Sequence, residues 1–172
     1  RWVNFDNSVY GSWADFSKST YRRNADYSES IHQGWVNLSG STYAGVAAFN
    51  GSIFDDKIYF SEDIDNNSSS RFTDCAPEFY DETNHQNTLF GSHNNNFTVE
   101  NGKGYPVYRG FAGLPLGCAF LTAEQKEYLE YKFQEIEKIN NIILKNNPFE
   151  KELKKIRDKE YAFFFIGLGG MC

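Results

Sequence analysis

Residues 34–60 decide the predicted fold, and they read Gly34-Trp-Val-Asn-Leu-Ser-Gly-Ser-Thr-Tyr-Ala-Gly-Val-Ala-Ala-Phe-Asn-Gly-Ser-Ile-Phe-Asp-Asp-Lys-Ile-Tyr-Phe60. The stretch consists of short β-branched and aromatic runs that are bounded by Asn, Gly, Ser and Asp, which is the composition of strands between turns. Asn50-Gly51 tolerates a positive φ and so predicts a tight hairpin turn. Antiparallel β-structure is therefore expected here.

The same composition extends over residues 1–120, with further short runs at 97–99 and 107–111. This part is predicted to form a β-rich antiparallel sheet or sandwich, and no internal repeat is identified in it. The segments 61–74 and 81–96 are too long and polar for hairpin turns. Loops of that length in a compact domain are usually functional or mobile.

Residues 121–172 are predicted to form a helical hairpin and a final strand, which completes an α+β single domain over residues 1–172. Thr122 and Gln125 have capping-box spacing, so a helix is expected to begin there. An apolar stripe follows at helical spacing, and the helix is expected to stop at Asn146 and restart after Asn147-Pro148. The members of the stripe are Leu129, Phe133, Ile136 and Ile143.

The last twelve residues, 161–172, carry no charged side chain. The simpler interpretation is a core strand followed by a glycine turn. The alternative is the start of a membrane-inserting segment, which would bring this apolar tail into contact with a membrane, although twelve residues are too few to span one.

The charge balance narrows the class of partner. The chain of 172 residues has 17 basic and 23 acidic side chains, a net charge of −6, and all of the excess lies in residues 1–120. Binding to nucleic acid depends on clustered Lys and Arg, so a nucleic-acid partner is not expected. The 30 aromatic residues also argue against a disordered chain.

Five acceptor tripeptides for N-glycosylation, where chance predicts about two, favour an extracellular or virion-surface protein. The first residue, Arg1, indicates a processed chain or a fragment. The three cysteines are an odd number, which allows at most one internal disulfide, Cys75–Cys118, or three reduced thiols. The predicted glycosylation sites are Asn37, Asn50, Asn66, which overlaps a second tripeptide at Asn67, and Asn96.

Residues 63–74 place oxygen-bearing side chains at positions 1, 3, 5, 7 and 12 of a twelve-residue loop. This spacing resembles the calcium loop of EF-hand and dockerin-type sites, in which alternate residues turn their oxygens onto a hard cation. The resemblance implies Ca²⁺ as a cofactor, and a solvated Asx/Ser loop is the alternative. The implied ligands are Asp63, Asp65, Asn67 and Asp74.

Tyr108-Arg109-Gly110 and Glu135-Ile136-Glu137 resemble two motifs of ADP-ribosyltransferases, but the Ser-Thr-Ser strand that the family places between them is missing. The resemblance would imply a dinucleotide held by Arg109. The alternative for Arg109 is a strand residue that faces solvent or pairs with an acidic side chain.

Two further groups of residues could form a metal site or a catalytic site. Cys75, His85 and His93 could bind zinc, although they lack the close ligand pairs of structural zinc sites. Loop carboxylates could act as an acid/base pair in glycoside hydrolysis, where their separation sets the mechanism. The candidates for that pair are Glu78, Asp81 and Glu82.

No complete catalytic set is identified, and the aromatic residues among Asn, Ser and Asp point instead to binding. The predicted function is a non-enzymatic recognition or assembly module that binds a glycan, a protein receptor or further copies of itself. A secreted hydrolase that acts on carbohydrate is the alternative. The predicted ligand-binding residues are Trp13, Tyr21, Trp35 and Tyr43.

Overall fold

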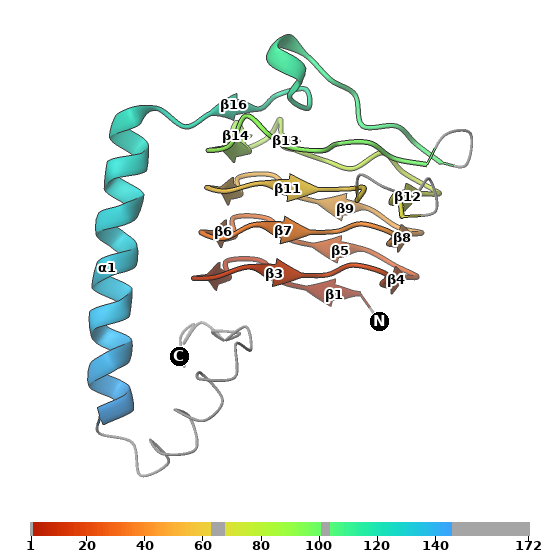
Figure 1. Cartoon of the computed structure of the whole chain (residues 1–172). Helices are drawn as coiled ribbons and strands as arrows, with labels where there is room; N and C mark the ends of the chain where they lie inside the picture. Colours follow the sequence, from red (N-terminus) through yellow and green to blue (C-terminus); the bar gives the residue numbers. More distant parts are fainter. Residues whose placement is uncertain (1, 63–67, 101–103, 146–172) are drawn as a thin grey trace.

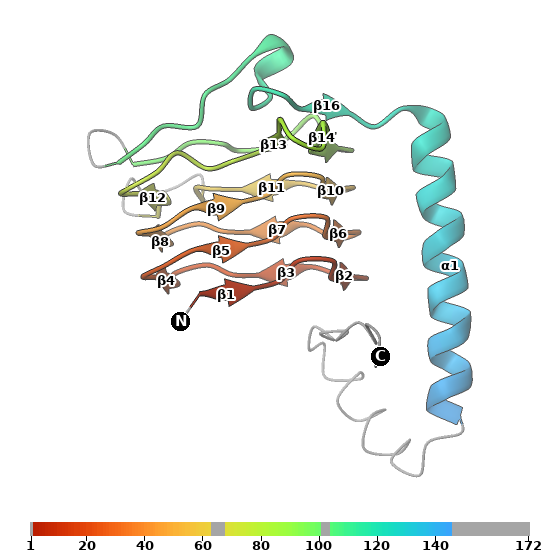
Figure 2. The same cartoon turned by 180° about the vertical axis from the view of Figure 1, so that it is seen from behind.

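The chain winds into a stack of parallel β-coils with one long helix along its side (Figures 1 and 2). The computed structural model describes residues 2–62, 68–100 and 104–145. We use "coil" for one passage of the chain around the stack. The first three coils each contribute a short strand to each of four faces, and neighbouring coils pair strand to strand; β15 and β16 extend one face further.

Faces 1 and 3 contain three strands each, which we list in stack order. Face 1 comprises β1 (Val3–Asn4), β5 (Ala25–Asp26) and β9 (Ala47–Ala48). Face 3 comprises β3 (Ala14–Asp15), β7 (Val36–Asn37) and β11 (Ile58–Tyr59).

Faces 2 and 4 alternate with them around the stack. Face 2 comprises β2 (Val9–Tyr10), β6 (Ile31–His32), β10 (Ile53–Phe54), β15 (Leu89–Phe90) and β16 (Ala119–Phe120). Face 4 comprises β4 (Thr20–Tyr21), β8 (Thr42–Tyr43) and β12 (Arg71–Phe72). A separate antiparallel pair is formed by β13 (Tyr80–Asp81) and β14 (Gln86–Asn87), and the short 3₁₀ segment η1 covers Phe111–Gly113.

The predicted antiparallel sandwich is therefore wrong. Strands of successive coils pair in parallel and in register, for example Val3 with Ala25 and Ala25 with Ala47. Both pairings join residues 22 apart, as do the other pairings up to β11, so the chain does contain a repeat. Asn50-Gly51 forms a turn, with Gly51 at φ 71°, but this turn joins β9 to β10 on the next face and is not a hairpin.

The repeat is built from triplets whose first and third side chains point inward and whose second points outward, as strand geometry requires. The triplets begin alternately five and six residues apart, at 3, 8, 14, 19, 25, 30, 36, 41, 47, 52 and 58. The first inward residue is small or β-branched and the third is large, as in Ala25-Asp26-Tyr27. This arrangement fills the interior of the first three coils with alternating small and large side chains.

The large inward residues form columns that run along the stack. In one column the rings of Tyr10, His32, Phe54 and Phe90 stack with centroid distances of 4.6, 4.8 and 5.5 Å. These separations match the spacing of neighbouring strands, about 4.8 Å. Interior rings thus follow the strand ladder and form much of the buried core.

Side chains at the corners satisfy backbone groups that the short strands leave unpaired. The Oδ1 atoms of Asp15 and Asp26 accept hydrogen bonds from the backbone N–H two residues later, which forms Asx turns. The buried hydroxyls of Ser52 and Ser70 donate to the carbonyls of Tyr27 and Leu38, respectively, each at 2.6 Å. Polar residues between the strands are thus corner residues of the coil.

The coils that follow Phe60 in the sequence contain extra residues. Thr42 pairs with Arg71, 29 residues later, which is seven more than the repeat length. The added residues lie between β11 and β12, and the β13–β14 pair forms a second insertion. Both insertions obscure the repeat in the sequence.

The helix α1 (Ala123–Lys145) begins as predicted. The backbone N–H of Thr122 donates to Gln125 Oε1 at 2.9 Å, and the N–H of Gln125 donates to Thr122 Oγ1 at 3.2 Å, so the capping box is confirmed. Leu129 and Phe133 are buried against the outward side chains of face 2. The predicted second helix and final strand lie at 147–172, outside the described residues.

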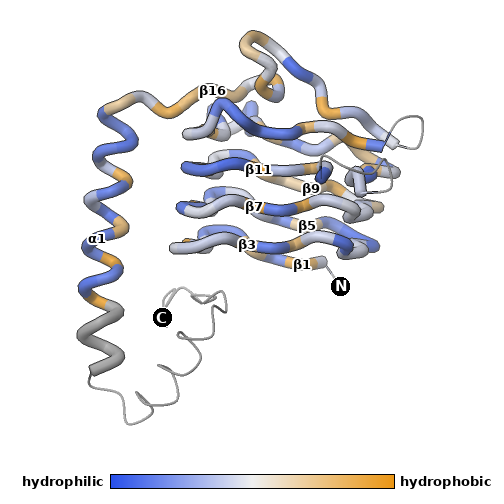
Figure 3. The backbone as a smooth tube through the Cα atoms, in the orientation of Figure 1, coloured by the Kyte–Doolittle hydropathy of each residue, from blue (hydrophilic) through white to orange (hydrophobic). Residues whose placement is uncertain are grey.

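Figure 3 shows that apolar residues recur along α1 among hydrophilic ones, as expected for a helix with one buried face. The outward residues of face 2 that meet this stripe are Val9, Ile31, Ile53 and Leu89. In the described part of the chain, no helix combines the length and the apolar character that a membrane span requires.

Candidate functional site: an aromatic strip on the coil stack

The best candidate for a binding site is a strip of aromatic side chains at the corner between faces 2 and 3. Trp13 and Trp35 lie one coil apart, with ring centroids 5.2 Å apart and an interplanar angle of 16°. Tyr59 meets Trp35 edge-on, with a centroid distance of 6.3 Å. We call these three residues the aromatic strip. Trp13 and Trp35 are each 36% exposed. The other residues at the corners of the stack are mostly polar, so two exposed indoles there are unusual.

The three tryptophans share one position of the repeat. Trp2, Trp13 and Trp35 each immediately precede a strand, at spacings of 11 and 22 residues. Asn24 and Val46 occupy the same position in other half-coils, so the coil does not need an indole there. The spacing of 11 is a sequence signal that would have linked the tryptophans.

The other two predicted ligand-binding residues are in the core. Tyr21 is 9% exposed and Tyr43 is 0% exposed, and their rings stack at 4.8 Å. Burial raises the pKa of Tyr43 well above that of an ordinary tyrosine. Neither ring is available to a ligand on the surface, because inward positions of the triplets on face 4 hold both.

Acidic side chains lie beside the aromatic strip on face 3. Asp15 is exposed on β3, one residue after the buried Ala14 that follows Trp13. In the next coil, Asn37 Nδ2 donates to Glu62 Oε1 at 3.0 Å, which holds that carboxylate beside the same face. A partner that covers the strip therefore meets negative charge next to it.

The described asparagines of the predicted glycosylation tripeptides take part in the coil corners. Asn37 Oδ1 accepts a hydrogen bond from the Ser39 N–H, and Asn96 Oδ1 accepts one from the Thr98 N–H. These are the same Asx turns that Asp15 forms with Ser17.

The two tripeptides at 37 and 96 therefore have a structural role that needs no glycan, although glycosylation itself stays a prediction. Asn37 is 6% exposed, and Asn96 Nδ2 donates to the Ser61 carbonyl at 2.8 Å. Asn50 Oδ1 accepts from Ser28 Oγ, and Asn66 lies outside the described residues.

Most of the predicted calcium ligands, Asp63, Asp65 and Asn67, lie outside the described residues, and Asp74 is exposed. Within the described ranges, no group of three or more His, Cys, Asp or Glu side chains is placed to hold a metal ion. The calcium site stays a prediction, but its twelve-residue loop is interrupted by the strand β12 (Arg71–Phe72), and Asp74 follows that strand.

The residues considered for zinc have separate surroundings. The hydroxyl of Tyr80 and Nδ1 of His85 are 2.9 Å apart, while the ring of His93 lies 4.0 Å from that of Phe120. Cys75 and Cys118 are free thiols, and burial raises the pKa of Cys118 to about 12. The disulfide alternative is therefore not formed, and Cys118 is a poor nucleophile.

One of the loop carboxylates considered for hydrolysis, Asp81, is held in its charged form by its own loop. Asp81 accepts hydrogen bonds from the N–H groups of Thr83 and Asn84, and these bonds lower its pKa. A general acid needs the opposite shift. Glu78 and Glu82 are exposed.

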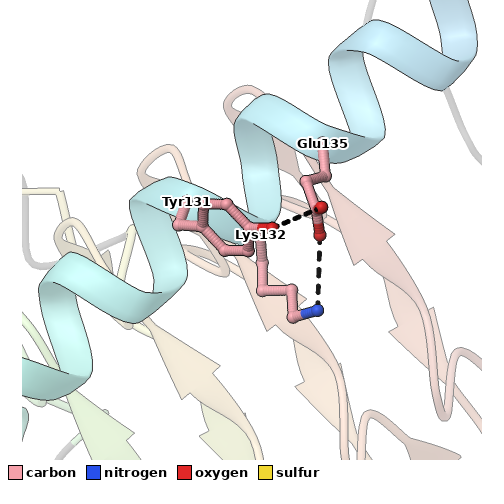
Figure 4. Close-up of polar contacts among 3 residues, drawn as sticks. All are labelled: Tyr131, Lys132 and Glu135. Atoms are coloured by element: carbon pink, nitrogen blue, oxygen red, sulfur yellow. Dashed lines mark hydrogen bonds and ion pairs between the residues drawn. The ribbon is translucent and has the colours of Figure 1, made fainter.

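The two motifs that resemble those of ADP-ribosyltransferases lie on different segments, one between β15 and β16 and the other on α1. Arg109 lies over the ring of Phe97, 5.9 Å from its centroid. Glu135 accepts hydrogen bonds from Tyr131 Oη at 2.6 Å and from Lys132 Nζ at 3.4 Å, all on α1 (Figure 4). Glu135 thus interacts within α1, whereas Arg109 lies against the buried Phe97 of the coil stack.

Comparisons with protein-family models, curated proteins and solved structures found no match to this chain.

Proposed function

We propose that the chain is a non-catalytic recognition module, extracellular or on a virion surface, that binds a protein partner through the aromatic strip. The observation that carries this proposal is the exposure of Trp13 and Trp35 on a rigid stack whose other outward corner positions are mostly polar. Exposed tryptophans are the residues that most often dominate the energy of protein interfaces. The parallel ladder fixes their separation before binding.

A protein partner fits the strip better than a glycan does. Sugar rings bind tryptophan by lying on an open ring face, but Trp13 and Trp35 each cover one ring face of the other at 5.2 Å, and Tyr59 meets Trp35 as well. The edges of stacked indoles remain outermost, and they suit apolar side chains and acceptors for the indole N–H. Asp15 and Glu62 lie nearby and favour a partner with Arg or Lys around its apolar contact.

The hydrolase alternative has less support. The carboxylate of Asp81 is stabilised in its charged form by its own loop, and Glu78 and Glu82 stand on exposed positions. The aromatic strip needs no reacting group to work as a binding surface. We therefore place the functional surface on face 3 and the corner before it.

The test is a selection of peptides on the intact chain. A displayed library of random twelve-residue peptides is panned against the wild-type protein, and enriched peptides are synthesised and titrated. We expect basic-aromatic or basic-aliphatic peptides whose affinity falls at least tenfold in the double variant Trp13→Ala/Trp35→Ala, because interface tryptophans cost about 2 kcal/mol or more when truncated.

Trp2→Ala is the matched control, since Trp2 occupies the same position of the repeat at the corner before face 1 and is 60% exposed. It should leave the affinity unchanged. Equal binding by the double variant and the wild type would contradict the proposal. Binding to a printed glycan array that is lost in the double variant would replace the protein partner with a glycan.

A further inference from the structure

A hollow beside Trp2 forms a second candidate site, separate from the aromatic strip. It has a volume of about 460 Å³ and lies at the corner between faces 4 and 1, where β4 leads into β5 (Figures 1 and 2). This corner is diagonally opposite the one that carries the strip. Because its lining residues come from successive coils, the hollow opens at the side of the stack. These residues are Trp2, Arg22, Arg23, Asn24, Ala44 and Gly45.

The charge of the hollow is positive, although the chain as a whole is acidic. Arg22 and Arg23 are both exposed, and no carboxylate in the described part of the chain pairs with either guanidinium. The neighbouring amide is oriented by the backbone, because Asn24 Oδ1 accepts a hydrogen bond from the Val46 N–H at 3.2 Å. Its Nδ2 group remains as a donor. Two guanidinium groups and one amide are therefore available to an anion.

The repeat itself does not require these arginines. The corners before β3, β7 and β9 occupy the same position in other half-coils and contain no basic residue. They read Gly11-Ser12-Trp13, Gln33-Gly34-Trp35 and Ala44-Gly45-Val46. Gly45, in contrast, is required by the fold, because a Cβ there would lie 2.6 Å from the carbonyl carbon of Arg23. The adjacent arginines are thus a property of this corner and not of the coil.

Trp2 differs from the tryptophans of the aromatic strip in its surroundings. It is 60% exposed, and the ladder places Asn24 and Val46 in its row where the strip has a second indole. Among the described residues, no aromatic ring stacks on it. Its indole can therefore take the apolar face of a sugar ring, which the stacked pair of the strip accepts less well.

We propose that this hollow binds a single acidic sugar residue of a glycan. The sugar ring lies against Trp2, and its acidic group accepts hydrogen bonds from Arg22 and Arg23, whose planar forks match the oxygens of a carboxylate or a sulfate. A volume of about 460 Å³ lies within the range of small-molecule sites, about 300–1,000 Å³. A long sulfated polymer fits less well, because the net charge of −6 repels a polyanion outside this corner.

The test titrates the whole chain with sialyllactose, sulfated lactose and neutral lactose, followed by ligand-observed NMR. We expect at least one acidic sugar to bind at least tenfold more tightly than lactose, because charge-assisted hydrogen bonds add to the contact with the indole. Preference for sialyllactose identifies a carboxylate as the acidic group, and preference for sulfated lactose identifies a sulfate. Either result supports the site.

Variants locate the binding. Arg22→Ala/Arg23→Ala should remove the preference over lactose, and Arg22→Lys/Arg23→Lys should restore it only in part, because lysine keeps the charge but loses the fork. Trp2→Ala should weaken binding of the preferred sugar at least fivefold, whereas Trp13→Ala/Trp35→Ala should not change it.

Three outcomes would overturn the proposal. The first is equal binding of all three sugars by the wild type. The second is a preference for the acidic sugar that persists in Arg22→Ala/Arg23→Ala. The third is binding of an acidic peptide that depends on Trp2 and the arginines while no sugar binds, since a protein partner would then be the occupant.

Discussion

Replacing Phe49 by Ala is expected to lower the free energy of unfolding by about 3–5 kcal/mol, the range for truncating a large buried aromatic residue. Phe49 is 1% exposed and stacks on Tyr27 and Phe79 at 5.0 and 5.2 Å. It also contacts the ring of Phe60 from the neighbouring column. The cavity would open in the middle of the stack, where the rigid ladder cannot collapse into it.

Urea unfolding followed by tryptophan fluorescence measures this effect. Phe111→Ala is the control, because Phe111 is 98% exposed and its removal should change stability by less than about 0.5 kcal/mol. A loss below 1 kcal/mol for Phe49→Ala would be incompatible with a central position in a packed interior column.

Low pH is expected to lower the free energy of unfolding through His32. His32 is fully buried in its column, and burial lowers its pKa to about 3. The unfolded state binds a proton near pH 6.5 but the folded state does not, so stability is complete above pH 6.5 and falls as the pH drops toward 3. The slope is about 1.4 kcal/mol per pH unit, or roughly 3 kcal/mol lost by pH 4.

His32→Phe isolates this contribution, because Phe54 and Phe90 occupy the same position in later coils. The Ser30 hydroxyl loses its 2.9 Å contact with His32 Nε2 but still donates to the Tyr27 carbonyl at 2.6 Å. Urea titrations at pH 7, 6, 5 and 4 should show a much shallower pH dependence for the variant. Parallel curves for the two proteins would exclude His32 as the acid-sensitive group.

The helix start could be predicted from the sequence because a capping box is a local signal. Thr122 and Gln125 satisfy each other's backbone N–H groups without help from distant residues. The strands between 34 and 60 were also predictable as extended, since their aromatic and β-branched composition is local. Composition does not, however, indicate whether the neighbouring strand runs parallel or antiparallel.

The parallel pairing was missed because the repeat is carried by alternation of five- and six-residue steps and not by identical residues. Ala25, Val36 and Ile58 all fill the first inward position of a triplet, although they differ in size. Insertions after Phe60 then break the 22-residue register. The Asn and Asp residues that resemble loop composition serve as corner caps in this fold.

The candidate site was half predictable. Trp13 and Trp35 were identified from their aromatic and polar surroundings, and they do reach the surface. Tyr21 and Tyr43 share those surroundings in sequence but fall on inward positions, which only the triplet register reveals.

The parallel 22-residue register is tested most directly by cross-linking Thr20→Cys with Thr42→Cys, in a background with every native cysteine replaced by Ser. The two residues pair across β4 and β8 with outward side chains, at a Cα separation of about 4.8 Å that suits a disulfide. Rapid, nearly complete oxidation is expected. The pair Thr20→Cys/Ser41→Cys should stay reduced, because Ser41 points into the interior. Failure of the 20–42 pair to oxidise while the 20–41 pair does so would contradict the parallel coil.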